Sequence, residues 1–295
     1  MRVFVTGATG YIGSAVAREL ADAGHDVAGL TRMAEKSSYL EGLGARAVLG
    51  DIRDVDSYRG EAAAADALVH IAAEDSPAGP DVDLMALEAL LRAAEDGKAT
   101  RLVYTSGCFV LGETEEPAAE DASTDNAPPL VAWRPPRERR VIEAASPALA
   151  TAVIRPGMVY GGKNGMFATY FVTAERNDAA SFIGDGANHW SPVYLGDVAR
   201  LYRLVLEERA RGIFHCAEGA ELVGNLAVAA SRAAGAGGAT HRIRLEEARE
   251  EYGPFADALV MDQIMICPRS RELGWEPEHP PFVESADAVY AEWKG

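Results

Sequence analysis

Residues 1–13 read MRVFVTGATGYIG, and this stretch decides the fold. Its Val-Phe-Val run is short and apolar, which is typical of a buried strand in a parallel sheet. Gly7, Gly10 and Gly13 follow at three-residue spacing, and a helical pattern begins near Ser14. In this context, glycines allow a tight turn, a close approach to a pyrophosphate and close helix packing. We therefore expect the N–H groups and the positive end of the helix to bind the phosphates of a dinucleotide.

Strand-like and helical segments alternate along the first half of the chain. Short apolar runs predict strands at residues 3–5, 25–32, 45–52, 67–73, 101–107, 151–161 and 212–217. Amphipathic patterns predict helices at residues 14–24, 81–96 and 133–145. This alternation predicts the α/β class, with a Rossmann-type doubly wound, mostly parallel sheet and a smaller C-terminal substrate lobe.

The pattern loosens beyond Gly161, where glycine turns flank a segment rich in aromatic residues. These aromatic residues suit a substrate pocket or the core of a small lobe equally well. We assign residues 1–160, with parts of 187–217, to a dinucleotide-binding domain. Residues 161–186 and 218–295 are assigned to a substrate-binding lobe that is interleaved with this domain.

Four local features carry separate predictions. Residues 113–129 are acidic and lack periodicity, which indicates a surface loop. Residues 228–238 predict a helix that ends in small residues, and the charged run 242–252 predicts a solvated surface. His70 lies within an apolar strand, so we expect it to be a packed core histidine rather than a catalyst.

Composition excludes several classes of function. The chain has 45 acidic and 28 basic residues and a net charge of −17, which argues against nucleic-acid or anionic-membrane partners. Cys108, Cys216 and Cys267 are scattered and form no CxxC pair, so reduced thiols and no metal site are expected. Met1 runs directly into the first strand, and no apolar run approaches the ~18 residues of a membrane span. We therefore expect a cytoplasmic protein.

The ends of the second and third predicted strands indicate which nucleotide is bound. The second strand ends at Thr31-Arg32, and no acidic residue follows before Glu35. An acidic residue at this place commonly binds the ribose of NAD, whereas a cation suits the 2′-phosphate of NADP. NADP(H) is therefore favoured, with NAD(H) as the alternative. Asp51-Ile52 would frame the adenine, although Asp51 suits a helix cap equally well.

Five motifs occur in order along nearly the whole chain. They are Thr6-Gly-Ala-Thr-Gly-Tyr-Ile-Gly13, His70-Ile-Ala-Ala73, Arg155-Pro-Gly-Met-Val-Tyr-Gly161, Pro192-Val-Tyr-Leu-Gly-Asp-Val-Ala199 and Leu273-Gly-Trp275. Together they resemble the extended short-chain dehydrogenase/reductase family, which includes sugar-nucleotide epimerases and dehydratases. The resemblance implies an NAD or NADP cofactor, and it places Arg32 where NADP-using reductases carry a phosphate-binding arginine.

The strand ends and the resemblance together define the residues expected to contact the cofactor. These are Gly7, Thr9, Gly10, Tyr11, Ile12, Gly13, Thr31, Arg32, Asp51, Ile52, Ile71, Ala72, Ala73, Thr105, Ser106, Arg137, Pro156 and Val159.

The catalytic residues that the resemblance implies are not in place. Family members carry a Ser or Thr after the fifth strand and a Tyr-x-x-x-Lys pair on the next helix. Here Gly107 occupies the first position, and Trp133 and Arg137 occupy the other two. An indole N–H is not an acid near neutral pH, and an arginine stays charged, so the usual proton relay is absent. The pair Tyr290 and Lys294 has the required spacing, but we interpret it as chance.

The candidate catalytic residues that remain are Ser106, Trp133, Arg137 and Tyr160, and Cys108 and His189 are further candidate proton donors. Arg137 would hold a ribose hydroxyl or a phosphate, and Trp133 would form an aromatic wall beside the nicotinamide or the substrate.

Three functional hypotheses follow. The first is an atypical NADP(H)-dependent oxidoreductase that acts on a small-molecule carbonyl, imine or activated double bond. The second is an NADP-binding regulatory or scaffold protein without turnover, resembling the NmrA-like regulators, and the third is a non-redox epimerase or lyase. The resemblance also implies a homodimer through the helices at residues 81–96 and 133–145. The apolar excess of the first helix agrees with this, but a buried core explains it equally well.

Overall fold

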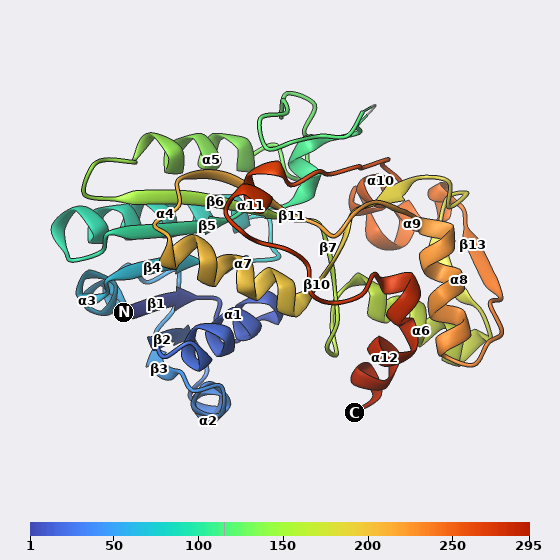
Figure 1. The fold of residues 1–295 in the computed structure, drawn as a ribbon, viewed down its shortest axis with the longest axis horizontal. Coiled ribbons are helices and arrows are strands. Elements are labelled where there is room, and N and C mark those ends of the chain that lie inside the picture. The colour runs from blue at the N-terminus through green and yellow to red at the C-terminus, as the bar shows by residue number, and fades with distance from the viewer. Residues whose placement is uncertain (115) are drawn as a thin grey trace. The chain divides into compact units, whose positions relative to one another are not determined.

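The computed structural model describes residues 1–114 and 116–295, which form two compact units (Figure 1). The first unit comprises Met1–Ser106, Trp133–Ile154 and Val198–Phe214. The second comprises Gly107–Ala132, Arg155–Asp197 and His215–Gly295. Each unit is therefore assembled from three separate segments of the chain.

A seven-stranded sheet organises the first unit. Its spatial order is β11 (Gly212–Cys216), β6 (Ala150–Pro156), β5 (Arg101–Thr105), β4 (Ala67–His70), β1 (Arg2–Thr6), β2 (Asp26–Thr31) and β3 (Arg46–Leu49). The pairings from β3 through to β6 are parallel. The order reverses between β1 and β4, which is the point where open α/β sheets bind ligands. The predicted α/β class and Rossmann-type topology are confirmed.

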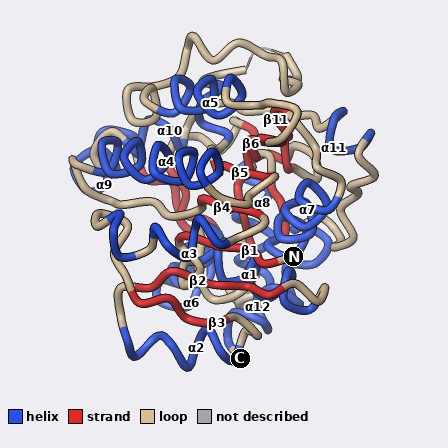
Figure 2. Tube along the Cα trace, turned by 90° about the vertical axis from the view of Figure 1, so that its left-hand side faces the viewer, coloured by secondary structure: helices blue, strands red, loops and turns tan. Residues whose placement is uncertain are grey.

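Helices cover both faces of this sheet (Figure 2). On one face lie α3 (Arg59–Ala64), α4 (Gly79–Asp96) and α5 (Arg134–Glu143), and on the other lie α1 (Tyr11–Asp22) and α7 (Leu195–Glu207). The short elements η1 (Ala34–Lys36), α2 (Ser37–Gly42) and η2 (Val55–Ser57) lie in the connections that follow β2 and β3.

The core on the α3–α4–α5 face explains most of the apolar excess of α4. Phe4 and Leu68 on the strands are fully buried, in the same cluster as Leu87 and Leu90 of α4. Burying such side chains is the main favourable contribution to folding. Met85 of α4 is 38% exposed and lies outside this cluster.

The second unit combines short strand pairs with helices. The parallel pairs are β7 (Met158–Tyr160) with β10 (Pro192–Tyr194) and β8 (Ala180–Ile183) with β13 (Thr240–Ile243). β9 (His189–Trp190) and β12 (Glu221–Leu222) are antiparallel. The helices are η3 (Cys108–Leu111), α6 (Met166–Asn177), α8 (Val223–Ala233), α9 (Leu245–Tyr252), α10 (Phe255–Leu259), α11 (Pro268–Glu272) and α12 (Phe282–Lys294).

Two segments of this unit differ from the predictions. The helix predicted at residues 228–238 is α8, which ends at Ala233 because Gly235, Gly237 and Gly238 adopt positive φ angles. The charged run 242–252 is mainly exposed, as expected, but most of it forms α9. The sequence predicted only a solvated surface here, because this helix is polar on most of its circumference.

The acidic segment at residues 113–129 is not entirely at the surface. Glu120 is only 3% exposed, and its Oε1 accepts hydrogen bonds from the backbone N–H groups of His215 at 3.4 Å and Arg269 at 3.2 Å. Oε1 thus satisfies two buried N–H groups, whereas Oε2 has no hydrogen-bond partner among the described residues. The surface-loop prediction is therefore wrong at Glu120.

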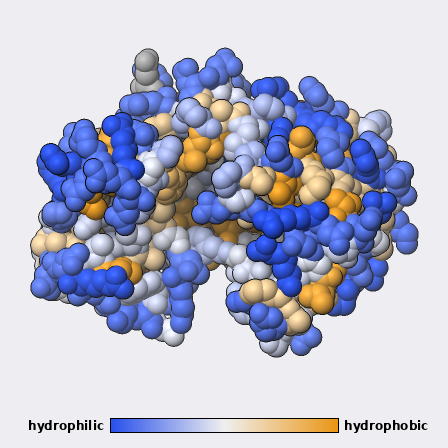
Figure 3. All heavy atoms as spheres, turned by 180° about the vertical axis from the view of Figure 1, so that it is seen from behind, coloured by the Kyte–Doolittle hydropathy of each residue, from blue (hydrophilic) through white to orange (hydrophobic). Residues whose placement is uncertain are grey.

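The outer surface is mostly hydrophilic on the face drawn in Figure 3, and hydrophobic residues appear there in scattered patches. Such scattered patches are ordinary for a folded chain. Among the described residues, no helix combines the length and the hydropathy that crossing a membrane requires.

Candidate functional site

The glycine loop between β1 and α1 is dictated by close backbone packing. Gly7 has a φ of +71°, and a Cβ there would lie 2.6 Å from the backbone nitrogen of Ala72. A Cβ on Gly13 would lie 2.0 Å from the carbonyl oxygen of Gly7. Both distances are far below van der Waals contact, so neither position accepts a side chain without a backbone shift.

Gly10 has a different role from the other two glycines. It is the N-cap residue of α1 and supplies no capping side chain, and it lines a pocket. Its nearest neighbour to an added Cβ is the Gly7 oxygen, at 3.2 Å. A side chain here would therefore enter the space in front of the helix N-terminus, which is the place where a phosphate is bound in such loops.

The pocket lies at the carboxyl ends of β1 to β5, entirely within the first unit, and has a volume of about 730 Å³. This size is typical of small-molecule and cofactor sites. The residues predicted to contact the cofactor that line it are Gly7, Thr9, Gly10, Tyr11, Ile12, Gly13, Thr31, Arg32, Ile52, Ile71, Ala72, Ala73, Thr105 and Ser106.

Three other predicted residues of this unit are not part of the lining that the described residues form. Asp51 accepts a hydrogen bond from the backbone N–H of Arg53 at 2.9 Å and so closes a local turn. Arg137 donates from Nη2 to the carbonyl oxygen of Pro80 at 3.3 Å and therefore contacts α4. Trp133 precedes α5, and its ring lies under the guanidinium of Arg134.

Sequence reasoning missed an ion pair on the pocket wall. Arg53, after β3, and Glu74, after β4, form a bidentate pair, with Nε to Oε2 at 2.8 Å. The Ser76 hydroxyl donates to Glu74 Oε1 at 2.6 Å. The hydrogen bond from Arg53, with that from Ser76, lowers the pKa of Glu74 to about 2. The pair joins the loop after β3 to the loop after β4, and no local sequence pattern indicates such a contact.

A buried polar network lies beneath the loop. Thr6 Oγ1 lies 2.7 Å from Nδ1 of His70 and accepts from the Ala72 N–H at 3.4 Å. Nε2 of His70 lies 3.4 Å from Oδ1 of Asp83, whose Oδ2 accepts from the Tyr104 hydroxyl at 3.0 Å. His70 is 1% exposed. It is therefore buried as expected, and it connects the nucleotide loop to α4.

At the β5 end of the pocket, Thr105 and Ser106 differ in their bonding. The Thr105 hydroxyl lies 2.6 Å from the Tyr202 hydroxyl, whereas the buried Ser106 Oγ has no hydrogen-bond partner among the described residues. Arg134, which also lines the pocket, donates from Nη1 to the Thr105 carbonyl oxygen at 3.1 Å. An orphaned hydroxyl and a cation therefore occupy this end.

Tyr160 lies in the second unit, as do Pro156 and Val159. The Tyr160 hydroxyl donates to Oε2 of Glu218 at 2.8 Å, and burial followed by the Glu218 charge raises its pKa above the ordinary value. A relay tyrosine needs a lowered pKa, so the environment of Tyr160 acts in the opposite direction.

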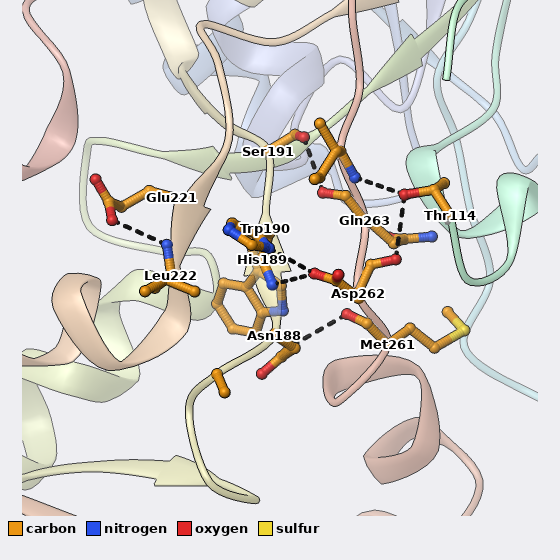
Figure 4. Close-up of polar contacts among 12 residues, drawn as sticks. Thr114, Asn188, His189, Trp190, Ser191, Glu221, Leu222, Met261, Asp262 and Gln263 are labelled. Carbon is orange, nitrogen blue, oxygen red and sulfur yellow. Dashed lines mark hydrogen bonds and ion pairs between the residues drawn. The ribbon is translucent and has the colours of Figure 1, made fainter. Parts of the chain in front are cut away.

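The other candidate proton donors also lie in the second unit. Figure 4 shows His189 facing Asp262, with Nδ1 2.8 Å from Oδ1. Nearby, Asn188 Nδ2 donates to the Met261 carbonyl oxygen at 3.0 Å, so this cluster ties the segment at residues 259–265 to β9. Burial raises the pKa of the Cys108 thiol to about 12, which keeps it protonated.

The fold and the pocket together define a Rossmann-type nucleotide-binding protein, because a glycine loop and an uncapped helix start face a pocket at the switch point of a parallel sheet. The sequence pattern of the NAD dependent epimerase/dehydratase family matches residues 3–217, which is more than half of the chain. The chain belongs to this NAD(P)-binding family. The resemblance to extended short-chain dehydrogenases/reductases is thus confirmed.

Similar proteins differ in the nucleotide named with them. The 2-alkyl-3-oxoalkanoate reductase of Stenotrophomonas maltophilia is 28% identical over 242 residues, which cover 76% of this chain and 71% of the reductase. The human epimerase family protein SDR39U1, solved with NADPH, has a TM-score of 0.81 at 19% identity, with 99% of both chains covered. The UDP-glucose 4-epimerase of Thermus thermophilus, solved with NAD, has a TM-score of 0.80 at 21% identity, with 100% and 99% covered. At these identities the two structures show a shared fold.

Proposed function

We propose that the protein is an atypical NADP(H)-dependent oxidoreductase that acts on a carbonyl, imine or activated double bond of a small molecule. The observation that carries this proposal is Arg32 on the pocket wall at the end of β2, in the place where NAD-binding chains commonly carry an acidic residue. The similarity to a reductase of oxoalkanoates supports the reaction class.

Different residues of the pocket would bind different parts of the cofactor. The N-terminus of α1, opened by Gly10, would hold the pyrophosphate, and Arg32 would pair with the 2′-phosphate. When bound, a nicotinamide supplies or accepts the hydride. Trp133 and Arg137 stand where the relay Tyr and Lys are expected, so the proton would come from water or from the substrate.

The proposal is tested by mixing the protein with NADPH and a panel of ketones, aldehydes, imines and enones in a stopped-flow spectrometer. Loss of the NADPH absorbance with at least one class of substrate is expected. If no member of a broad panel oxidises NADPH, the oxidoreductase proposal is overturned.

Arg32→Ala is expected to weaken NADP⁺ binding by roughly 10- to 100-fold, because one charge-assisted contact to phosphate is lost. NAD⁺ binding should change by less than about 3-fold, since NAD⁺ has no 2′-phosphate. Titration calorimetry with both nucleotides measures this difference. Arg59→Ala, which removes an exposed arginine outside the pocket lining, serves as the matched control. Equal losses for both nucleotides would show that Arg32 does not meet the 2′-phosphate.

The substituted relay positions also favour a second candidate, an NADP-binding regulatory or scaffold protein without turnover. This candidate requires binding that discriminates NADP⁺ from NADPH and a partner protein that responds to the difference. A measured turnover with any substrate excludes it. A non-redox epimerase or lyase is less well supported, because such enzymes of this family use the Tyr and Lys that Trp133 and Arg137 replace.

Three further aspects complete the proposal. We propose that residues 161–186 and 218–295, which lie in the second unit, carry further substrate-recognition residues. We also propose that the protein is cytoplasmic. We also propose a homodimer through α4 and α5. Most leucines of α4 are buried in the core of the first unit, so they would not contribute to such an interface. Sedimentation velocity would distinguish a dimer from a monomer.

A further inference from the structure

Ser106 is placed to bind a ligand rather than to stabilise the fold. Its backbone N–H donates to the Ile154 carbonyl oxygen at 2.8 Å, which fixes the residue beside β6. The residue is 7% exposed, and Oγ has no hydrogen-bond partner among the described residues. The hydroxyl of neighbouring Thr105 is already engaged by Tyr202. Buried polar groups are usually satisfied. Of the buried side-chain atoms without a hydrogen-bond partner among the described residues, Ser106 Oγ is the one whose residue lines the pocket, which makes it a candidate contact for a ligand atom.

Arg134 brings a positive charge to the same end of the pocket. Among the described residues, no carboxylate forms an ion pair with it. One N–H of its guanidinium is used by the Thr105 carbonyl oxygen, and the group lies 4.4 Å from the Trp133 ring centroid. Stacking on an aromatic ring fixes the plane of a guanidinium, and its other N–H groups are not consumed by the Thr105 contact.

The start of α5 adds to the positive potential and offers few backbone donors. The helix has ten residues, no acidic residue in its first turn, and two prolines directly after Arg134. Pro135 and Pro136 have no N–H, so the helix start contributes its dipole and the backbone N–H of Arg134. The side-chain hydrogen bonds to a ligand at this end would come from the Arg134 guanidinium and the Ser106 hydroxyl.

We propose that Arg134 and Ser106 form an anion subsite that binds the carboxylate of the substrate, so that the substrate class is an oxo acid. This inference rests on the proposed function, because a bound carboxylate belongs to a substrate only if the protein is an enzyme. The Arg134 guanidinium and the Ser106 hydroxyl offer donors and positive charge, which are the complement of a carboxylate. Of the two carboxylates on the pocket wall, Glu74 is paired with Arg53 and Asp75 is exposed. A guanidinium held in a fixed plane recognises a planar carboxylate better than a point charge does.

The test is equilibrium binding of oxamate, a small planar carboxylate, to the protein saturated with NADP⁺ and to the nucleotide-free protein. Arg134→Gln is expected to weaken oxamate binding by at least about 10-fold. Arg134→Lys should weaken it by less, because lysine keeps the positive charge but lacks the paired N–H donors of a planar guanidinium. Ser106→Ala is expected to weaken it by about 3- to 10-fold. Oxamide, the neutral diamide, should not distinguish the variants.

Arg139→Gln is the matched control, because Arg139 is an exposed arginine of the same helix and is not part of the pocket lining. The midpoint of thermal unfolding of each variant, measured on the same samples, reports whether it is folded. Oxamate binding that is equal in the wild type and in Arg134→Gln, or absent from the wild type, overturns the subsite. If the wild type binds no NADP⁺, the proposed function fails, and the nucleotide-free titration still decides the subsite.

Discussion

Gly13→Ala is expected to abolish measurable nucleotide binding and to lower the free energy of unfolding by about 2–4 kcal/mol. The added Cβ would lie 2.0 Å from the Gly7 oxygen and 2.7 Å from the Gly7 carbonyl carbon. Both are backbone atoms of the loop that faces the pocket, so relief requires moving the loop itself. Alanine is the better helix former by about 1 kcal/mol, which does not offset a backbone clash of this size.

Urea denaturation and NADPH fluorescence titration measure the two effects of Gly13→Ala. The matched control is Gly60→Ala in α3, where an added Cβ has nothing within 4 Å. That change is expected to leave binding intact and to stabilise the protein by up to about 1 kcal/mol, because a helical glycine is replaced. Wild-type affinity and stability in Gly13→Ala would show that the loop tolerates a side chain.

The features that the sequence predicts well are those encoded locally. The strand, the three glycines and the following helix lie within residues 1–24. Gly10 and Gly13 approach atoms of that stretch, and Gly7 alone approaches a distant segment, at Ala72 after β4. The pattern of apolar runs also predicts the strands of the sheet, because a strand buried on both faces must be apolar throughout. The place of Arg32 on the pocket wall is predicted in the same way, from its position at a strand end.

The features that the sequence does not predict depend on contacts between distant segments. Arg53 reads as an ordinary solvated arginine, and only the approach of the loop after β4 gives it Glu74 as a partner. Arg137 has the spacing of the family's lysine, yet it contacts the Pro80 oxygen on α4. Arg134, one residue after Trp133, lines the pocket instead. A difference of three residues at a helix start changes the direction of a side chain, which spacing alone does not resolve.

Glu218 contacts the start of α12 and is expected to make the stability of the protein depend on pH. Its Oε1 accepts from the Phe282 N–H at 3.2 Å, and its Oε2 accepts from the Tyr160 hydroxyl at 2.8 Å. Burial, with a smaller contribution from nearby Asp197, raises the pKa of Glu218 to about 7, against the opposing effect of the hydrogen bonds from Tyr160 and Phe282. The folded chain therefore keeps a proton on Glu218 at a pH where the unfolded chain has released it.

This difference links the stability of the protein to pH. Between an ordinary pKa of 4.5 and the folded pKa of about 7, the folded state binds more protons than the unfolded state. The free energy of unfolding therefore falls as pH rises through this window, by about 3 kcal/mol in total from this group. Below pH 4.5 Glu218 is protonated in both states, and above pH 7 it is ionised in both, so its contribution is constant outside the window.

Glu218→Gln is expected to remove this pH dependence while keeping the local contacts. A glutamine oxygen still accepts from the Phe282 N–H, and its amide faces a Tyr160 hydroxyl that has the Pro280 carbonyl oxygen within 3.1 Å as an alternative acceptor. Relative to the wild type, the variant should gain about 3 kcal/mol between pH 4.5 and pH 8 in urea denaturation followed by tryptophan fluorescence. Subtracting the two profiles cancels the titration of groups common to both proteins.

The control for this experiment is Glu284→Gln, which removes an exposed carboxylate two residues after Phe282 in the same helix. If the loss of any negative charge near the start of α12 accounted for the effect, both variants would show the same change with pH. The burial of Glu218 predicts instead that only Glu218→Gln departs from the wild-type profile, and that the departure grows between pH 4.5 and 7. Parallel profiles for the wild type and Glu218→Gln would mean that Glu218 is ionised in the folded protein throughout this range.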